Sequence, residues 1–186
     1  KQGWISRNKL LINKSPTYFT VPLEKISSYQ LICDTKIQQN QYSKWKSKFL
    51  KTVCQSYKKS PYYKEVYPIV EQVMNAHTET INQLAKNSIK AVLNYLQLST
   101  TIIDSSSIYN NAHLSSVSRV IDICKKEAAL IYINPLGGKE LYAKNHFLEH
   151  GIELLFLQPQ LLEYKQNSNS FTAGLSIIDV LMNNSI

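Results

Sequence analysis

Residues 132–142 contain a glycine pair after an apolar run. Residues of these types in this order could form a ligand-binding loop. The run 128–133 leads into Asn134, and Gly137 and Gly138 come next in a chain that has only 5 glycines. Two glycines in succession mark a backbone that needs positive φ or that lets another group approach closely. We therefore expect a tight turn or a ligand at this loop, and the residues alone leave both open.

Ser105 and Ser106 add hydroxyl groups after another short segment, the β-branched residues 99–104. Backbone N–H groups at a glycine turn that enters a helix attract anions, and serine hydroxyls at a neighbouring strand end supply further donors. The alternative is that the glycines only permit a turn and the serines cap a helix. The spacing matches neither the GxGxxG of dinucleotide folds nor the GxxxxGK[ST] of a P-loop.

Arg7 and Asn8 form a polar pair between apolar neighbours near the start of the sequence. Arginine suits bidentate recognition of a carboxylate or a phosphate, although Arg7 could also cap the edge of a sheet. Asp179 interrupts an apolar segment near the other end, where a charged group is usually paired or functional. A structural interpretation is that Asp179 neutralises Arg7.

The sequence offers neither a metal site nor a clear nucleophile. Cys33, Cys54 and Cys124 lie far apart without CxxC spacing, which argues against a disulfide framework or a zinc site and favours a reduced, cytoplasmic setting. The histidines show no metal-ligand spacing. We assign no metal, no cofactor and no catalytic residue. Since no run of roughly eighteen apolar residues occurs, we expect no membrane span.

Positive charge is concentrated in the first half of the sequence. Residues 1–90 hold 15 Lys and Arg against 5 acids, whereas residues 91–186 hold 6 against 8, within a net charge of +8. Lysines alternate with aromatic residues at 44–51 and 57–64, as on nucleic-acid surfaces, but a solvated helix face is the preferred explanation. No nucleic-acid-binding motif is present, so we expect an anionic small molecule rather than a nucleic acid.

Hydrophobic periodicity predicts the elements of the first half. Strands are expected at 17–23 and 30–37, and a helix at 42–57 with one apolar face. Residues 62–67 are predicted to turn before a short helix at 68–76 that has proline near its start. A further helix is predicted over 78–98, capped by Thr78 or Thr80.

The second half alternates between strand and helix patterns. Strands are predicted at 99–104, 129–133 and 152–157, and helices at 116–128 and 139–150. This alternation is typical of βαβ units, so the predicted fold class is α/β, with a parallel sheet and flanking helices in the C-terminal half and extra strands and helices in the N-terminal half of one domain. Ligands bind such sheets beyond the carboxyl ends of the strands, where the serine and glycine loops would converge.

Several motifs occur in an order that resembles the WbqC-like protein family: 3-GWISRN-8, 20-TVPL-23, 57-YKKSPYY-63, 132-YINPLGGKELY-142, 151-GIELLFL-157 and 175-LSIIDVLMNN-184. The resemblance implies a protein of bacterial polysaccharide gene clusters, notably those for O-antigen, with glycine transferase activity. Members of that family begin with an aromatic- and proline-rich strand and loop, and this sequence starts just after it. We therefore expect an N-terminal strand segment of the domain to be missing.

Two hypotheses follow from the residues and the resemblance. The first is a transferase that modifies a nucleotide-linked sugar; it predicts a deep cleft at 134–142 that also collects Arg7, Ser105 and Tyr142. The second is a non-catalytic protein of the same pathway that binds a small molecule or a nucleotide; it predicts that the glycine turn packs against protein. The predicted ligand-binding residues are Arg7, Asn8, Ser105, Ser106, Asn134, Gly137, Gly138 and Tyr142. The donor, the acceptor and the oligomeric state are not predicted.

Overall fold

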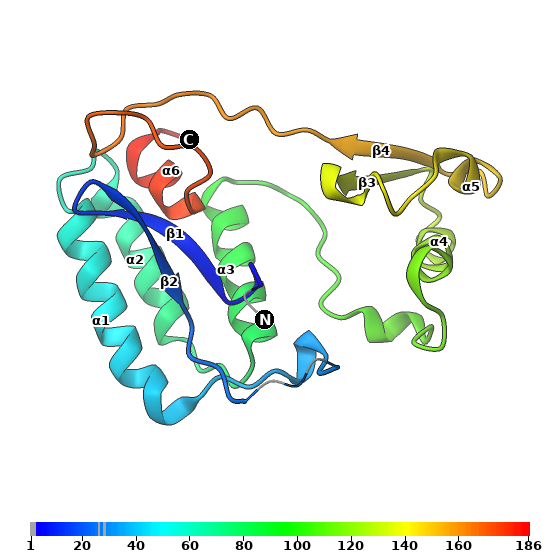
Figure 1. Ribbon diagram of the computed structural model, residues 1–186, viewed down its shortest axis with the longest axis horizontal. Coiled ribbons are helices and arrows are strands. Elements are labelled where there is room, and N and C mark those ends of the chain that lie inside the picture. The colour runs from blue at the N-terminus through cyan, green and yellow to red at the C-terminus, as the bar shows by residue number, and fades with distance from the viewer. Residues whose placement is uncertain (1–2, 26, 28) are drawn as a thin grey trace. The chain divides into compact units, whose positions relative to one another are not determined.

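The computed structural model describes residues 3–25, 27 and 29–186, and the chain divides into two compact units (Figure 1). Unit 1 comprises residues 1–100 and 161–186, and unit 2 comprises residues 101–160. The described residues form a mixed α/β fold, which confirms the predicted class. That the two units make up a single domain stays a prediction.

Unit 1 begins with an antiparallel hairpin of β1 (Arg7–Ile12) and β2 (Ser15–Thr20). The two residues of its turn, Asn13 and Lys14, have φ of 51° and 63°. Two successive left-handed residues match the twist of a two-residue hairpin, which explains why an asparagine occupies the first position. The strand predicted at 17–23 overlaps β2, whereas β1 was not predicted.

The strand predicted at 30–37 is wrong. The structure has a short 3-10 helix, η1 (Ile32–Asp34), and the segment takes part only in isolated bridges, Leu23 with Ile37 and Lys36 with Thr80. The Thr35 hydroxyl donates to the carbonyl of Leu31 at 2.9 Å. Such local side-chain bonds to the backbone compete with the ladder of a sheet and favour a turn.

Four helices complete unit 1: α1 (Gln39–Tyr57), α2 (Tyr63–Asn75), α3 (Ile81–Tyr95) and α6 (Ile177–Asn183). The helix predicted at 42–57 is confirmed, and Phe49, Val53 and Tyr57 on its apolar face are buried. α3 begins after Thr80, whose hydroxyl accepts a hydrogen bond from the N–H of Gln83 in a reciprocal capping box.

α2 differs from the prediction because Pro68 lies inside the helix rather than near its start. Proline removes one helical hydrogen bond and is costly in a helix interior. Val66 precedes the proline and is 1 % exposed, and Val70 and Val73 follow it on the same buried face. Burial of an apolar face that extends across Pro68 outweighs the missing bond, so the helix begins upstream of the proline.

The core of unit 1 lies between the hairpin and the helices, with α2 packed against α1, α3 and α6. Burial of apolar surface is the main favourable term in folding, and this core joins segments far apart in the sequence. Its buried members are Leu10, Val21, Ile37, Tyr42, Phe49, Val53, Tyr57, Val66, Val70, Val73, Met74, Ile81, Leu84, Leu181 and Met182.

Unit 2 is built around a parallel pair of strands, β3 (Ile131–Pro135) and β4 (Glu153–Leu157), in the register Ile131 to Glu153. α4 (Ser116–Lys126) precedes β3, and α5 (Lys144–Leu148) connects β3 to β4. This βαβ unit confirms the predicted parallel arrangement for two of the three strands. Ile121, Cys124, Phe147, Ile152 and Leu154 form its buried core.

Two predictions for the second half of the sequence need correction. Residues 99–104 form no strand, and the segment leads instead into a 3-10 helix, η2 (Ser106–Tyr109). Ile103 is 43 % exposed, so this segment lacks the burial that would select a strand. The helix predicted at 139–150 is shortened to α5, because residues 136–143 form a 3-10 turn, η3 (Leu136–Gly138), and the bends that follow it.

Candidate functional site

The glycine loop follows β3 directly, and its two glycines have different surroundings. Gly138 is buried, and a Cβ atom placed on it would lie 2.7 Å from Nδ2 of Asn134. Gly137 is exposed, with no atom within 4 Å of such a Cβ atom. Neither glycine has positive φ, so of the two expected reasons for glycine only a close approach applies. At Gly138 the close approach of Asn134 is what requires glycine.

An aromatic cluster of Tyr132, Tyr142 and Phe147 lies next to this loop. The rings of Tyr132 and Phe147 stack with centroids 5.4 Å apart, and Tyr142 meets both rings edge-on. The Nδ2 group of Asn134 donates to the Tyr132 hydroxyl at 3.2 Å, and burial raises the pKa of Tyr132. The N–H of Tyr142 donates to the carbonyl of Gly138, so packing and hydrogen bonds fix the geometry of the loop.

The serine loop is the second polar region of unit 2. Ser105 caps η2, and its Oγ accepts from the N–H of Ser107 at 3.2 Å and lies 2.8 Å from the Ser107 hydroxyl. The predicted capping role is therefore present for Ser105. Ser106 faces a different partner, because Nη2 of Arg119 donates to its Oγ at 3.3 Å. The sequence did not single out Arg119.

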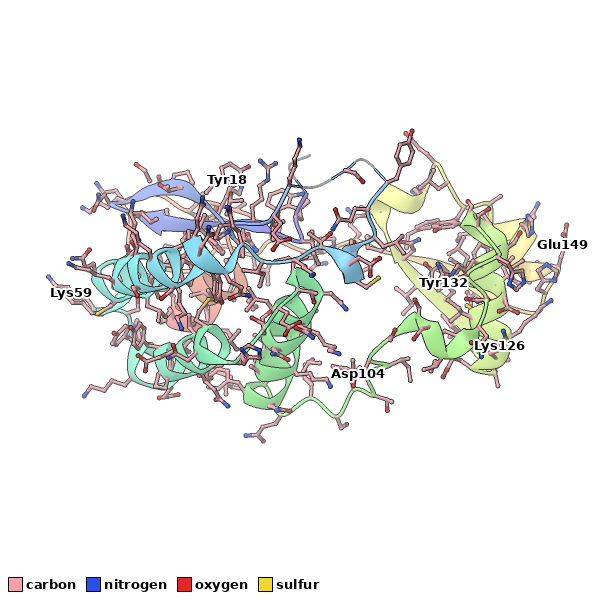
Figure 2. All side chains as sticks on the ribbon, turned by 90° about the horizontal axis from the view of Figure 1, so that it is seen from below. Tyr18, Lys59, Asp104, Lys126, Tyr132 and Glu149 are labelled. Carbon is pink, nitrogen blue, oxygen red and sulfur yellow. The ribbon has the colours of Figure 1, made fainter. Side chains whose placement is uncertain are left out.

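A buried amide holds Arg119 in this position. Asn111 is 1 % exposed, and its Oδ1 accepts from Nε of Arg119 at 3.2 Å. Nδ2 of Asn111 donates to Asp122 at 2.7 Å, and Lys126 binds the same carboxylate at 2.8 Å. The hydrogen bonds from Lys126 and Asn111 hold the pKa of Asp122 below its usual value. Lys126 is labelled in Figure 2 with Tyr132 of the same unit.

The sequence did not predict this network, because its residues are not spaced as in any known motif. Asn111 and Arg119 are eight residues apart and lie on a loop and on α4. The one available signal was an arginine inside an otherwise amphipathic helix pattern directly after a serine-rich loop. That signal is weak, since most helical arginines are solvated.

Arg7 and Asn8 lie in unit 1, at the start of β1. The guanidinium of Arg7 lies over the rings of Trp4 and Tyr18, 5.6 and 4.9 Å from their centroids. Such cation–π contacts stabilise the arginine by roughly 0.5–1 kcal/mol where they are exposed. Oδ1 of Asn8 accepts from the N–H of Lys9.

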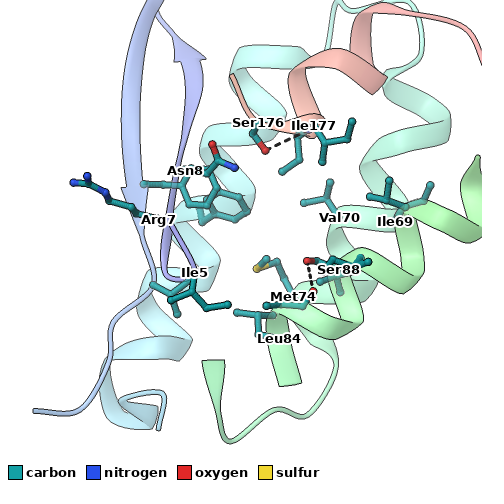
Figure 3. A pocket seen from close by; sticks show the side chains of 18 of the residues that line it. Ile5, Arg7, Asn8, Ile69, Val70, Met74, Leu84, Ser88, Ser176 and Ile177 are labelled. Carbon is teal, nitrogen blue, oxygen red and sulfur yellow. Dashed lines mark hydrogen bonds between the residues drawn. The ribbon is translucent and has the colours of Figure 1, made fainter. Parts of the chain in front are cut away.

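A hollow of about 530 Å³ in unit 1 borders the same strand. Most of its lining is apolar and comes from α2, α3 and α6, including Val70, Met74 and Leu84. Figure 3 shows Asn8 facing this hollow and the end of Arg7 pointing away from it. Its size falls in the range of small-molecule sites, and Arg7, the charged residue in its lining, directs its guanidinium away from it.

Asp179 does not neutralise Arg7. It is fully buried, and its carboxylate accepts hydrogen bonds from the hydroxyls of Tyr57 at 2.8 Å and Tyr164 at 2.7 Å and from Nε2 of Gln166 at 3.2 Å. Burial and the hydrogen bond to Asp179 raise the pKa of Tyr164 to about 12. Burial, followed by the charge of Asp179, also raises the pKa of Tyr57. This network joins α1, α6 and residues 164–166, which is a structural role.

Within residues 3–25, 27 and 29–186, no group of three or more His, Cys, Asp and Glu side chains could hold a metal ion. His146 and His150 have ring centroids 5.8 Å apart, and Nδ1 of His150 lies 3.3 Å from the Lys125 ammonium. The described helices also include none that is long and apolar enough to cross a membrane.

The predicted site residues are therefore distributed over both units. Arg7 and Asn8 belong to unit 1, and the other six belong to unit 2. Packing and hydrogen bonds bring together Asn134, Gly138 and Tyr142, and chain adjacency brings together Ser105 and Ser106. That all eight residues contact one ligand in a deep cleft stays a prediction.

Comparison with known proteins identifies one family. The profile of the WbqC-like protein family matches residues 1–186, which includes both units. No curated protein and no solved structure matches the chain.

Proposed function

Because the chain belongs to the WbqC-like protein family, we propose that it is a transferase that moves a glycyl or other aminoacyl group onto a nucleotide-linked sugar. We assign the reaction to the biosynthesis of bacterial surface polysaccharide such as O-antigen, in the cytoplasm. Aminoacyl transfer to a sugar amine needs a base near the amine, donors for the developing oxyanion and a holder for the nucleotide phosphates.

The observation that carries the proposal is the ordered loop at the carboxyl end of β3. In parallel α/β units this edge is where ligands bind. The Asn134 amide is held over Gly138 and against Tyr132, so its direction is fixed before a ligand arrives. A fixed amide and an exposed turn at Gly137 supply donors that need no reorganisation on binding.

The test is a thermal-shift screen of the chain against nucleotide sugars, ATP and amino acids. A ligand that binds the native state raises the melting temperature by mass action. We expect a nucleotide sugar to produce such a shift, and mass spectrometry of a mixture with an activated amino acid to detect an aminoacylated sugar. If no nucleotide sugar shifts the melting temperature, the proposed substrate class is wrong.

The alternative function is a non-catalytic protein of the same pathway that binds a small molecule or a nucleotide. Its specific support is the burial of Gly138 against the chain's own Asn134, since a turn that packs against protein is what this alternative predicts. Binding of a nucleotide sugar without any turnover, under conditions where both substrates are present, would favour this alternative over the transferase.

A further inference from the structure

We propose that Arg119, together with the hydroxyls of Ser105 and Ser106, forms a binding site for a phosphate group. The inference deepens the proposed function, and it rests on that function only for the identity of the molecule that carries the phosphate. Its three residues lie in unit 2: Ser105 precedes η2, Ser106 begins η2, and Arg119 lies in the first turn of α4.

The charge of Arg119 is not cancelled by a neighbouring acid. In the part of the chain that the structure describes, Arg119 makes hydrogen bonds to Asn111 and Ser106 and no ion pair with a carboxylate. The closest acid on the same network, Asp122, is already bound by Lys126 and Asn111. An arginine that is partly buried and has no counter-ion is a receptor for an anion.

The direction of the guanidinium is also fixed. Asn111 binds Nε of Arg119 and is itself held by Asp122 inside the unit, with 1 % of its surface exposed. Since one edge of the guanidinium is used by Asn111 and Ser106, Nη1 is left for a ligand. Pre-orientation reduces the entropy that an arginine loses on binding and favours a charge-assisted contact.

The hydroxyl groups favour phosphate over carboxylate. The Ser106 oxygen accepts from Arg119, which leaves the Ser106 proton to donate to an anion. The hydroxyls of Ser105 and Ser107 are hydrogen-bonded to each other at 2.8 Å, which leaves one of their two protons to donate to an anion. A tetrahedral phosphate has oxygens outside the plane of the guanidinium and can use these donors, whereas a planar carboxylate matches the guanidinium alone.

The competing interpretation is that Arg119 only ties η2 to α4. Both interpretations predict some loss of stability when Arg119 is replaced, so stability does not separate them. Affinity for a phosphate compound separates them, because a purely structural arginine changes affinity only through the folded fraction.

The experiment is calorimetric titration of the full chain with inorganic pyrophosphate, and separately with acetate as a carboxylate probe. Arg119→Gln removes the charge and keeps a polar side chain, Arg119→Lys keeps the charge, and Ser106→Ala removes one hydroxyl. Lys125→Gln is the matched control, since it removes one positive charge from the same helix at a residue that contacts His150. Melting curves of all variants give the folded fraction.

We expect pyrophosphate to bind the unmodified chain, and Arg119→Gln to weaken binding by about tenfold or more, the loss typical of one charge-assisted contact. Arg119→Lys and Ser106→Ala should weaken it less, and Lys125→Gln should stay within about threefold, as expected of a screened surface charge. If Arg119→Gln does not fold, the proposal is judged on the other two variants.

Three results would overturn the inference: no binding of pyrophosphate, equal losses in Arg119→Gln and Lys125→Gln, or tighter binding of acetate than of pyrophosphate. The proposed function fails separately. Pyrophosphate binding that depends on Arg119, without binding of any nucleotide sugar, would retain the phosphate site and reject the substrate class. A nucleotide sugar that binds Arg119→Gln as well as the unmodified chain would retain the substrate class and reject the phosphate site.

Discussion

Unit 1 and unit 2 differ in how far their candidate polar residues are buried. Unit 1 encloses its most polar cluster, since Asp179 is fully buried and is held by Tyr57, Tyr164 and Gln166. Unit 2 also buries one amide, that of Asn111, but its Ser105, Ser106 and Gly137 are exposed. A buried and satisfied network fixes a structure, whereas polar groups on ordered loops remain available to a ligand.

The two units also differ in the size of their buried apolar cores. The buried apolar core of unit 1 draws on the hairpin and four helices, whereas that of unit 2 has five buried members around two strands. The strands of unit 2 also leave apolar side chains in solvent, with Ile131 52 % and Ile133 59 % exposed. Small cores bury a smaller fraction of their surface and are marginally stable. We therefore expect unit 1 to contribute most of the stability.

The largest expected effect is that of Phe147→Ala in unit 2. Phe147 is fully buried and contacts both Tyr132 and Tyr142, so its removal should cost about 3–5 kcal/mol. Urea unfolding followed by circular dichroism measures the loss. Both tryptophans, Trp4 and Trp45, lie in unit 1, so their fluorescence reports on that unit alone. We expect the tryptophan transition to move less than the dichroism transition, and equal shifts would contradict the division into two units.

Asp179→Ala should have the largest effect on unit 1. It leaves the hydroxyls of Tyr57 and Tyr164 without their acceptor, which should reduce the free energy of unfolding by about 2–3 kcal/mol. Here the tryptophan transition should move. Asp179→Asn keeps one oxygen acceptor of the same shape and should lose less. A variant as stable as the unmodified chain would mean that the buried network is not what stabilises unit 1.

A smaller effect is expected at alkaline pH. The folded chain raises the pKa of Tyr164 from its ordinary value near 10 to about 12, and it raises the pKa of Tyr57 in the same direction. The two protonated hydroxyls contribute stability that is fully present below about pH 10 and is lost as the pH rises through about 12. The reason is that the unfolded chain releases these two protons at a lower pH than the folded chain does. The urea concentration at the unfolding midpoint should therefore fall as the pH is raised from about 10 to about 12. It should fall less steeply in Tyr164→Phe. An identical slope in that variant would contradict the assignment.

The smallest change in stability is expected at the glycine loop. Gly137→Ala meets no neighbouring atom and should alter the free energy of unfolding by less than about 0.5 kcal/mol. Gly138→Ala must displace Asn134 and its hydrogen bond to Tyr132, which should cost about 1 kcal/mol.

Both glycine variants should nevertheless bind a nucleotide sugar more weakly, because the loop then presents a methyl group or a moved amide to the ligand. Melting temperature and affinity measured on the same samples decide the matter. A lower melting temperature with unchanged affinity of the folded fraction would remove this loop from the site.

Local patterns in the sequence were sufficient for α1, α3, α4 and the parallel β3–β4 pair. In α1, Phe49 and Val53 mark the buried face, and Thr80 starts α3 with a cap that depends only on residues within one turn. Periodicity and capping are local properties, and they predict an element wherever no distant contact opposes them. Membership of the family could likewise be read from motifs spread along the chain.

Only the tertiary structure decided where α2 begins, whether residues 30–37 and 99–104 form strands, and which residues surround the predicted loops. Pro68 is tolerated because Val66 is buried by distant segments, and Asp179 is paired with tyrosines from elsewhere in the chain. Arg119 is a candidate because Asn111 and Ser106 hold it in the folded chain. Burial and side-chain hydrogen bonds between distant residues depend on the folded arrangement, so no spacing along the sequence determines them.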